Sequence, residues 1–511
     1  MKKKLIFFLL FLSFSISLLP VNASASTVDL SKKNLIKIKA FVNEQFNNAG
    51  IVGGSYAIVS NNKVIDSSGV GYRDLKLGKK ATDETIYAIA SVTKSFTATA
   101  ILQLQEQGKM NVNDPVQKYL PWFTYKDEEK SKQVTIQHLL THAAGVSRFD
   151  ADGAIFIDEE KNKNSLEASI RALRTVDMKT NPGEKAQYCN SCFNTLGLII
   201  EKVTGVSYYE YVKRNIFEPL GMEYTGFGQD LKSLTANDIA KEYSWFFGFR
   251  NTKLLNYREF GKSQDPEGGI YTNSVDLAKY VSGILGHSST SILSQKTLKT
   301  SYIGILPTEN NEWKYTGGGM EAGKISNRKV LYKGGDGIGS SAVMMLIPED
   351  KIGVVLLIGE SNSEPKQDIA KGMLQILIGE EAKAADSPLP LFKLTGFIML
   401  FLFIASILGL VVFLWAINKR LKRKDQVSKY RWLRIFISLI CFLFLVVISY
   451  LLLFVRPTQI GFYGYPYDWA IGLISLGVTL FLGLVYNGYL SIFGKYEERR
   501  GGRKNEKIIQ M

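Results

Sequence analysis

The sequence predicts an α+β fold, in which an antiparallel sheet carries a helical region, followed by three C-terminal transmembrane helices. Short β-branched runs occur at 55–66 and again at 329–358. Helical periodicity dominates the residues between them, from about 91 to 285. Strands at both ends with helices between them favour one sheet built from both termini, with a helical subdomain inserted.

The first 25 residues have the composition of a secretory signal peptide. Lysines at 2–4 precede an apolar run at 5–19, and a small-x-small site ends at Ala25. We therefore predict cleavage after Ala25 and an extracytoplasmic domain at 26–381. A retained signal anchor, the alternative, would leave the domain on the same side of the membrane.

The domain is expected to begin with a helix and a hairpin. Residues 31–48 place apolar side chains at helical spacing. Two short strands at 55–60 and 63–66 follow, and Asn61-Asn62 between them suits a hairpin turn. The late elements are three strands and a helix, expected at 329–332, 340–347, 352–358 and 366–378.

A serine and a lysine open a predicted helix at 91–107. Ser91 and Lys94 are three residues apart, so their side chains share one helix face. A hydroxyl beside an amine suits a nucleophile for acyl transfer, and the helix dipole favours the negative charge that develops there. Taken alone, such a pattern is more often an N-cap serine followed by a solvated lysine.

Three apolar segments follow a linker at 382–393, and each is long enough to span about 30 Å of hydrocarbon. We predict them as transmembrane helices within 394–495. They lie at 394–417, 435–455 and 470–493. Basic residues gather after the first segment and in the tail at 496–511, whereas the loop at 456–469 is aromatic. This asymmetry predicts a cytoplasmic tail and a multi-pass protein of the cell membrane.

The net charge of +15 does not indicate nucleic-acid binding. Residues 418–511 contain fifteen Lys or Arg residues and five Asp or Glu residues, and three more lysines stand at 2–4. The predicted domain is therefore close to neutral and lacks the basic stripe that phosphate binding requires.

Two further motifs follow the serine–lysine pair. Tyr188 and Asn190 form Tyr-x-Asn before a helical pattern, and Lys333 and Gly335 form Lys-x-Gly on a late strand. With Ser-x-x-Lys, Tyr-x-Asn and Lys-x-Gly in this order, the chain resembles the penicillin-recognising serine hydrolases, on the branch of class C β-lactamases, DD-peptidases and related esterases. Flanking segments extend the resemblance over nearly all of 31–380. They are Thr-Ile-Gln-His-Leu-Leu-Thr-His at 135–142, Phe-Glu-Pro-Leu-Gly-Met at 217–222 and Gly-Gly at 268–269.

The resemblance implies a β-lactamase/transpeptidase-like fold and a role for each catalytic residue. Ser91 would be the nucleophile that forms an acyl-enzyme. Lys94 would hold the proton network with a lowered pKa, because burial and neighbouring cations disfavour its charged form. Tyr188 would relay the proton, as a phenol or as a phenolate.

The resemblance also implies how substrate is bound. Asn190 would hydrogen-bond the substrate amide or Lys94, and Lys333 would anchor an anionic or carbonyl group. The backbone N–H of Asp336 would complete an oxyanion hole with that of the nucleophile, and Gly335 would let substrate lie against the strand. No metal and no cofactor are implied.

Two positions depart from the family pattern. Gly334 stands where Ser or Thr is usual, which puts in doubt a hydroxyl contact to a β-lactam or a substrate carboxylate. Cys189 and Cys192 flank Asn190 as Cys-x-x-Cys. Outside the cytoplasm a disulfide can persist, although two small buried thiols are the favoured interpretation.

Other catalytic chemistries fit less well. His138 and His142 are four residues apart, but the zinc-protease glutamate and a third ligand are missing, so structural roles are favoured. The sequence has no Gly-x-Ser-x-Gly elbow that a Ser-His-Asp hydrolase would use.

We therefore predict a membrane-anchored extracytoplasmic serine peptidase that cleaves an amide next to a D-amino acid in a small peptide-like substrate. The combination of signal peptide, hydrolase domain and apolar segments resembles the D-amino peptidases that mature colibactin- and zwittermicin-type prodrugs, and cell-wall peptide hydrolysis is also open. A β-lactamase or esterase of the same family is one alternative. A ligand sensor or a partner module of an export transporter is another. The oligomeric state is open.

Overall fold

The structure is a computed structural model. It describes residues 28–421 and 476–480, apart from residues 149, 153, 155–165, 229, 231–237, 253–261, 287–290, 338, 361–362, 386–390 and 479. The predicted signal peptide at 1–25, the predicted tail at 496–511, the apolar segment at 435–455 and most of that at 470–493 lie outside the described residues.

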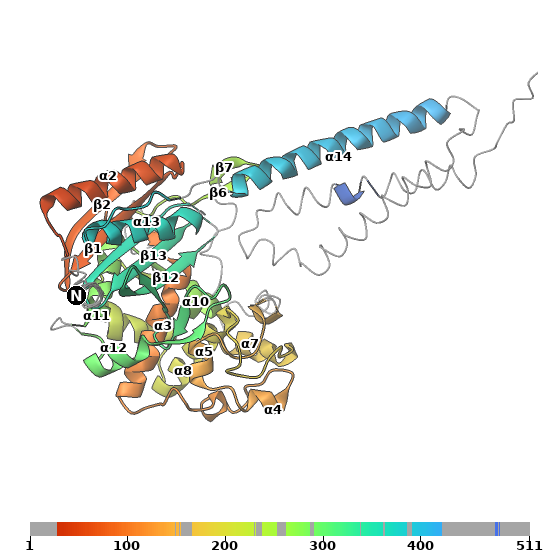
Figure 1. The fold of residues 1–511 in the computed structure, drawn as a ribbon. Helices are drawn as coiled ribbons and strands as arrows, with labels where there is room; N and C mark the ends of the chain where they lie inside the picture. Colours follow the sequence, from red (N-terminus) through yellow and green to blue (C-terminus); the bar gives the residue numbers. More distant parts are fainter. Residues whose placement is uncertain are drawn as a thin grey trace, which may run out of the picture.

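A sheet that is nine-stranded in the described part of the chain forms the centre of the fold (Figure 1). Its order is β3-β2-β1-β14-β13-β12-β11-β10-β9, and neighbouring strands are antiparallel. The strands are β1 Gly53–Ser60, β2 Lys63–Asp74, β3 Lys79–Lys80, β9 Gly304–Pro307, β10 Lys314–Thr316, β11 Glu321–Ile325, β12 Arg328–Asp336, β13 Ser341–Ile347 and β14 Ile352–Ile358. Because β1 pairs with β14, the sheet is built from both ends of the domain, as the sequence predicts.

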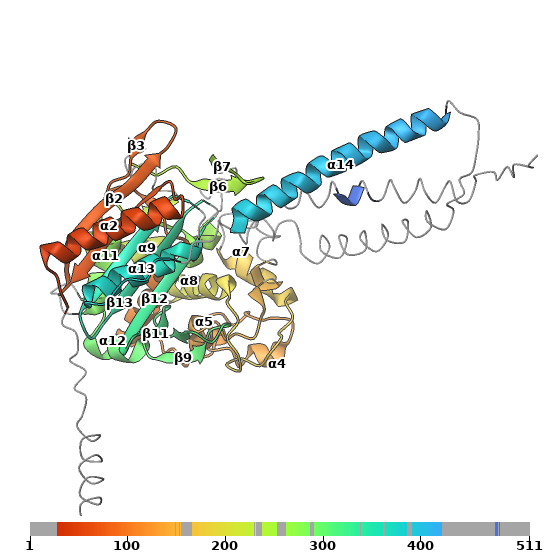
Figure 2. The same ribbon diagram turned by 45° about the horizontal axis from the view of Figure 1, so that its top comes forward.

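The sheet separates two hydrophobic cores, because successive strand residues point to opposite faces. Tyr56 and Ile58 pack with α2 Lys32–Asn48 and α13 Ser363–Leu377 on one face, where the two helices lie side by side (Figure 2). Ala57 and Val59 belong to the larger core of the other face. That core includes residues of α3 Thr93–Glu106, α8 Asn190–Thr204 and α11 Ser274–Leu285.

The helical subdomain surrounds α3, whose residues are buried continuously from Thr93 to Leu104. The helices in closest contact with it are α8, α9 Tyr208–Val212 and α10 Asp265–Gly268. Other short helices of the described residues are α4 Glu128–Ser131, α5 Ile136–Leu140, α7 Leu166–Arg171 and α12 Gln295–Ser301. Single-turn segments are η1 Ala90–Val92, η2 Val116–Lys118, η3 Ala172–Thr175, η4 Lys213–Phe217 and η7 Lys262–Gln264. In the part of the domain that the structure describes there are also two small sheets: β4 Tyr87–Ala88, β8 Ile270–Thr272 and β5 Gly226–Phe227 in one, and β6 Tyr243–Phe246 and β7 Phe249–Thr252 in the other.

The N-terminal elements predicted from the sequence are confirmed. Ser31 caps α2 by accepting a hydrogen bond from the backbone N–H of Asn34. Asn61 and Asn62 adopt left-handed φ angles of 46° and 65°, as a tight hairpin turn between β1 and β2 requires. Strands β9, β10 and β11 were not predicted, because they are short and lack a continuous run of buried β-branched residues.

The three transmembrane helices of the predicted fold class require correction. Among the residues that the structure describes, no helix combines the length and the apolar character needed to cross a membrane. The segment at 394–417 lies on α14 Leu391–Leu421, whose first turns are beside the β6–β7 hairpin (Figure 1). There Phe397 packs on Phe249, with ring centroids 5.5 Å apart. The prediction rested on hydropathy alone, and hydropathy gives the composition of a segment but not the surface that its side chains contact.

Candidate active site

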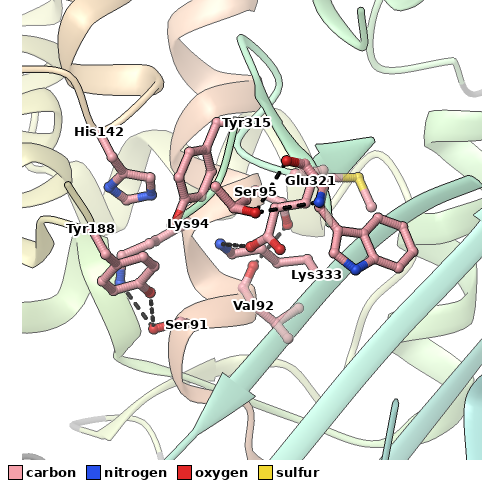
Figure 3. Close-up of polar contacts among 12 residues, drawn as sticks. Ser91, Val92, Lys94, Ser95, His142, Tyr188, Tyr315, Glu321 and Lys333 are labelled. Atoms are coloured by element: carbon pink, nitrogen blue, oxygen red, sulfur yellow. Dashed lines mark hydrogen bonds and ion pairs between the residues drawn. The ribbon is translucent and has the colours of Figure 1, made fainter. Parts of the chain in front are cut away.

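The three sequence motifs converge on one serine. Ser91 lies on η1 and Lys94 in the first turn of α3, whereas Tyr188 comes from the segment directly before α8. The Oγ of Ser91 is 3.0 Å from the Nζ of Lys94 and accepts a 2.7 Å hydrogen bond from the phenol of Tyr188 (Figure 3). Segments 97 residues apart in the chain therefore meet at the predicted nucleophile.

The turn that carries Ser91 is pressed against the sheet. Ala90 has a left-handed φ of 44°, an unfavourable backbone conformation for a residue with a Cβ. A Cβ added to Gly335 on β12 would lie 2.1 Å from the carbonyl oxygen of Ile89 and 3.0 Å from the backbone nitrogen of Ser91. Gly335 is therefore required for this approach, which brings the strand bearing Asp336 to the nucleophile.

Lys94 is enclosed and has a partner that sequence reasoning missed. Its side chain is fully buried, and its Nζ lies 2.8 Å from both the Oε2 and the backbone carbonyl oxygen of Glu267 on α10. Burial lowers the pKa of Lys94, and the Glu267 carboxylate opposes that change. Glu267 directly precedes Gly268-Gly269, but nothing in that sequence pattern reveals a contact with a lysine 173 positions earlier.

Tyr188 is a neutral phenol in this environment. Burial raises its pKa above the ordinary value of 10.0, although the charges of Lys333 and Arg148 act in the opposite direction. Its ring stacks on that of His142, with centroids 4.5 Å apart, and the Nζ of Lys333 lies 5.4 Å from its centroid. The phenol is thus held as a hydrogen-bond donor to the serine (Figure 3).

The two histidines of the 135–142 segment have structural partners. His138 and Thr135 form a capping box at the start of α5. His142 accepts a hydrogen bond from the backbone N–H of Cys189 at 3.0 Å, and burial holds its pKa well below 6.5. Within the described residues, no group of three or more His, Cys, Asp or Glu side chains could hold a metal ion.

The predicted substrate-binding residues differ in their surroundings. Lys333 is buried, with its Nζ 3.5 Å from a carboxylate oxygen of Glu321. Asp336 ends β12 and forms an ion pair with Lys366. Asn190 is not within hydrogen-bond distance of Lys94, since its Oδ1 has no hydrogen-bond partner among the described residues. Its contact with substrate remains a prediction.

A pocket of about 440 Å³ opens beside the nucleophile. Ser91 and Tyr188 form part of its wall, and residues of the β9–β10 connection and of β10, β11 and β12 form much of the rest. Among the described residues, four carboxylates and two cations line it, together with three aromatic rings besides that of Tyr188. These are Glu309, Glu312, Glu321, Asp336, Arg148, Lys333, Trp313, Tyr315 and Tyr332. Sequence reasoning missed Glu309, Glu312, Trp313, Tyr315 and Glu321 because β9, β10 and β11 were not recognised.

Gly334 has a steric explanation. A Cβ at this position would lie 2.3 Å from the hydroxyl of Tyr332, two residues earlier on the same face of β12. The phenol therefore takes the space that a serine or threonine side chain would need. Trp313 packs on the Tyr332 ring, with centroids 5.3 Å apart.

Cys189 and Cys192 are joined as a disulfide. Both residues are fully buried at the start of α8. The favoured interpretation as two thiols is therefore wrong, and the alternative that the sequence left open is the one observed. The bond closes the turn that contains Asn190 and directly follows Tyr188.

Comparison with known proteins extends the similarity over most of the chain. The family profile described as Beta-lactamase matches residues 38–377. Protein flp of Staphylococcus aureus strain N315 is 27% identical over 463 residues, which are 88% of this chain and 89% of flp. A teichoic acid D-alanine hydrolase of Staphylococcus aureus is 29% identical over 243 residues, which are 47% of this chain and 56% of that protein.

Solved structures share the fold. The octameric penicillin-binding protein homologue from Pyrococcus abyssi superimposes with a TM-score of 0.59 and 29% identity, covering 69% of this chain and 79% of the other.

Proposed function

The chain belongs to the Beta-lactamase family and is a serine hydrolase, and on that premise we propose that it hydrolyses an ester or amide bond of a D-amino acid whose amino group is free. One observation carries the proposal: the Oγ of Ser91 contacts both Lys94 and Tyr188 at the edge of a pocket in which carboxylates outnumber cations. The contacts of Ser91 make it an acyl-transfer nucleophile, and the carboxylates of the pocket provide a place for an ammonium group.

The first chemical step uses the contacts of the serine. Ser91 Oγ bonds to the substrate carbonyl carbon while its proton passes to Lys94, whose pKa burial has lowered. The tetrahedral intermediate collapses, the bond to the leaving group breaks, and the leaving group takes a proton from the phenol of Tyr188, which regains one from Lys94. Water then attacks the acyl-enzyme, releases the D-amino acid and restores Ser91.

The carbonyl oxygen needs donors while it is negatively charged. We assign this role to the backbone N–H groups of Ser91 and Asp336, as the family resemblance implies. The close approach of Gly335 to the Ser91 turn supports the assignment, because it brings β12 against the nucleophile.

The charges in the pocket favour a cationic group on the substrate. Glu309 accepts hydrogen bonds from the backbone N–H of Tyr188 and the hydroxyl of Tyr315, and Glu312 accepts one from the Asn310 amide. These donors are neutral, so they leave the negative charge of both glutamates in place. A free amino group on a D-aminoacyl substrate would complement that charge.

A substrate carboxylate is less well served. Lys333 is already beside Glu321, and Gly334 offers no hydroxyl. These features argue against β-lactams and against peptides that end in a free carboxylate as preferred substrates. The name of one relative, teichoic acid D-alanine hydrolase, agrees with a D-aminoacyl substrate.

We also propose that the hydrolase acts outside the cytoplasm. The signal-peptide pattern at 1–25 supports export. The Cys189–Cys192 disulfide supports an oxidising compartment.

The proposal is tested with matched substrates. D-Alanine p-nitroanilide and the D-alanyl ester of glycerol carry the free amino group, N-acetyl-D-alanine p-nitroanilide lacks it, and L-alanine p-nitroanilide inverts the stereocentre. We expect kcat/KM to be at least tenfold higher for the free D-aminoacyl compounds than for either control. Ser91→Ala should abolish turnover, and intact-mass spectrometry should detect a D-alanyl adduct only on the wild type.

Three results would refute this function. The first is preference for the N-acetylated substrate, and the second is rapid turnover of a chromogenic cephalosporin. The third is an adduct on Ser91 that never clears, which would indicate a ligand sensor.

A further inference from the structure

Glu267 occupies an unusual position for a residue outside the three motifs. Both of its contacts with Lys94 come from oxygen atoms, the side-chain Oε2 and the main-chain carbonyl, each 2.8 Å from the Nζ. Its side chain is 4% exposed, and that of Lys94 is 0% exposed. The pair therefore lies in a region where a charge has little solvent to stabilise it.

The contacts of Glu267 determine how a neutral Lys94 is oriented. A neutral amine has two N–H bonds and one lone pair, and a carbonyl oxygen and a carboxylate oxygen can only accept hydrogen bonds. The two N–H bonds must therefore point to Glu267. The lone pair is left for the remaining neighbour, the hydroxyl of Ser91 at 3.0 Å.

The segment that bears Glu267, from α10 to the start of β8, is hydrogen-bonded to α3 on both sides of Lys94. Thr97 donates a 2.6 Å hydrogen bond to the carbonyl oxygen of Pro266, and Thr93 accepts one of 3.2 Å from the N–H of Ile270. On the far side, a Cβ added to Gly197 of α8 would lie 2.2 Å from the Pro266 ring. Because α10 is held between α3 and α8, the backbone at Glu267 cannot shift without breaking these contacts.

We propose that Glu267 is the positioning residue of a Ser91–Lys94–Glu267 triad: it directs the lone pair of Lys94 to the serine proton and stabilises the ammonium group formed when that proton arrives. The proton moves from Ser91 Oγ to Lys94 Nζ, and Glu267 remains a carboxylate throughout. This inference rests on the proposed acyl-transfer function. In this triad Glu267 would orient Lys94, as a carboxylate orients the catalytic base of other serine hydrolases.

Several charged groups surround the triad and enter its pH dependence. Asp152 accepts a hydrogen bond from the N–H of Ser191 and lies 3.8 Å from Arg148, and burial raises its pKa to about 7. Tyr188 is near Lys94 on the pocket side, with its ring centroid 5.1 Å from the Nζ. The Nζ of Lys333 lies 5.4 Å from the same centroid, and the neutral His142 ring stacks on Tyr188.

Neutralising Glu267 removes the strongest influence that holds the pKa of Lys94 up against burial. The base must be neutral to accept the serine proton, so the acid limb of kcat/KM follows the Lys94 pKa. Glu267→Gln should therefore move that limb to lower pH by about one unit or more. The rate above the limb should fall by about 100-fold or more, since the base is no longer oriented and its ammonium is no longer paired.

The experiment uses the full chain and p-nitrophenyl acetate, which reports acyl transfer at Ser91 whatever the natural acyl group is. The pH profile of kcat/KM is measured for wild type, Glu267→Gln, Glu267→Asp and Asp152→Asn. Asp152→Asn is the matched control, because it removes a buried carboxylate that does not touch Lys94. We expect it to keep the rate within about tenfold and to move the limb by less than half as much.

The Glu267 and Asp152 variants distinguish a positioning role of Glu267 from a merely structural one. Glu267→Asp retains the charge, so it should keep the acid limb of the pH profile near its wild-type position while kcat/KM falls. It replaces Glu267→Gln in the test if that variant does not fold. A Glu267→Gln profile that coincides with wild type, or an equal shift in Asp152→Asn, overturns the triad. A wild type that turns over neither p-nitrophenyl acetate nor the free D-aminoacyl substrates, and forms no adduct on Ser91, instead overturns the proposed function, so the two failures are distinguishable.

Discussion

Gly335→Ala provides a direct test of how β12 and the nucleophile turn fit together. The added Cβ would lie 2.1 Å from the Ile89 carbonyl oxygen, about 1 Å closer than ordinary Cβ contacts, and 3.0 Å from the backbone nitrogen of Ser91. The obstructing atoms belong to the backbone, so the turn must move by about that distance. A displacement of 1 Å in a catalytic group costs about 10²-fold in rate.

We therefore expect Gly335→Ala to lower kcat at least about 100-fold on the free D-aminoacyl substrates. Overpacking should lower the free energy of unfolding by about 1–3 kcal/mol. Gly317→Ala is the matched control, because its Cβ would lie 3.4 Å from the Gln137 side chain, an ordinary contact. Steady-state kinetics and thermal unfolding of both variants check the reasoning. A Gly335→Ala enzyme within threefold of the wild-type kcat would refute it.

Three further changes have defined outcomes. Tyr188→Phe removes the phenol that donates to Ser91 and should lower kcat/KM by about 10²- to 10⁴-fold in steady-state assays; retention of a tenth of the activity would exclude a proton relay through this phenol. Replacing Cys189 and Cys192 together by Ala should lower the free energy of unfolding by about 2 kcal/mol or less, because the closed loop is short; a much larger loss in denaturant titrations would contradict this account. The folded state holds the pKa of His142 well below its unfolded value of about 6.5, so protonation favours the unfolded chain as pH falls through 6.5. Stability should therefore decrease from pH 7 to pH 5, by up to about 1.4 kcal/mol per pH unit below 6.5, and by less in His142→Gln; equal slopes for the two proteins would rule this out.

Much of the fold could be predicted because it depends on local patterns. The hairpin around Asn61-Asn62 and the late strands are readable from alternation and turn chemistry. The small strands β9–β11 were missed because their stability comes from neighbours in the sheet. The transmembrane prediction failed at 394–417 because hydropathy does not say which surface an apolar side chain will meet.

The order of Ser91, Lys94, Tyr188 and Lys333 along the chain was enough to identify the type of hydrolase, since each residue belongs to a short motif with its own chemistry. Only the tertiary structure could bring Glu267 to Lys94 and place Glu309 beside the backbone of Tyr188. Those contacts join residues 173 and 121 positions apart. The local sequence around a glutamate is the same whether its carboxylate faces water or a buried amine. The charges of this active site therefore depend on two features of the tertiary structure: α10 packs on α3, and the β9–β10 connection lines the pocket.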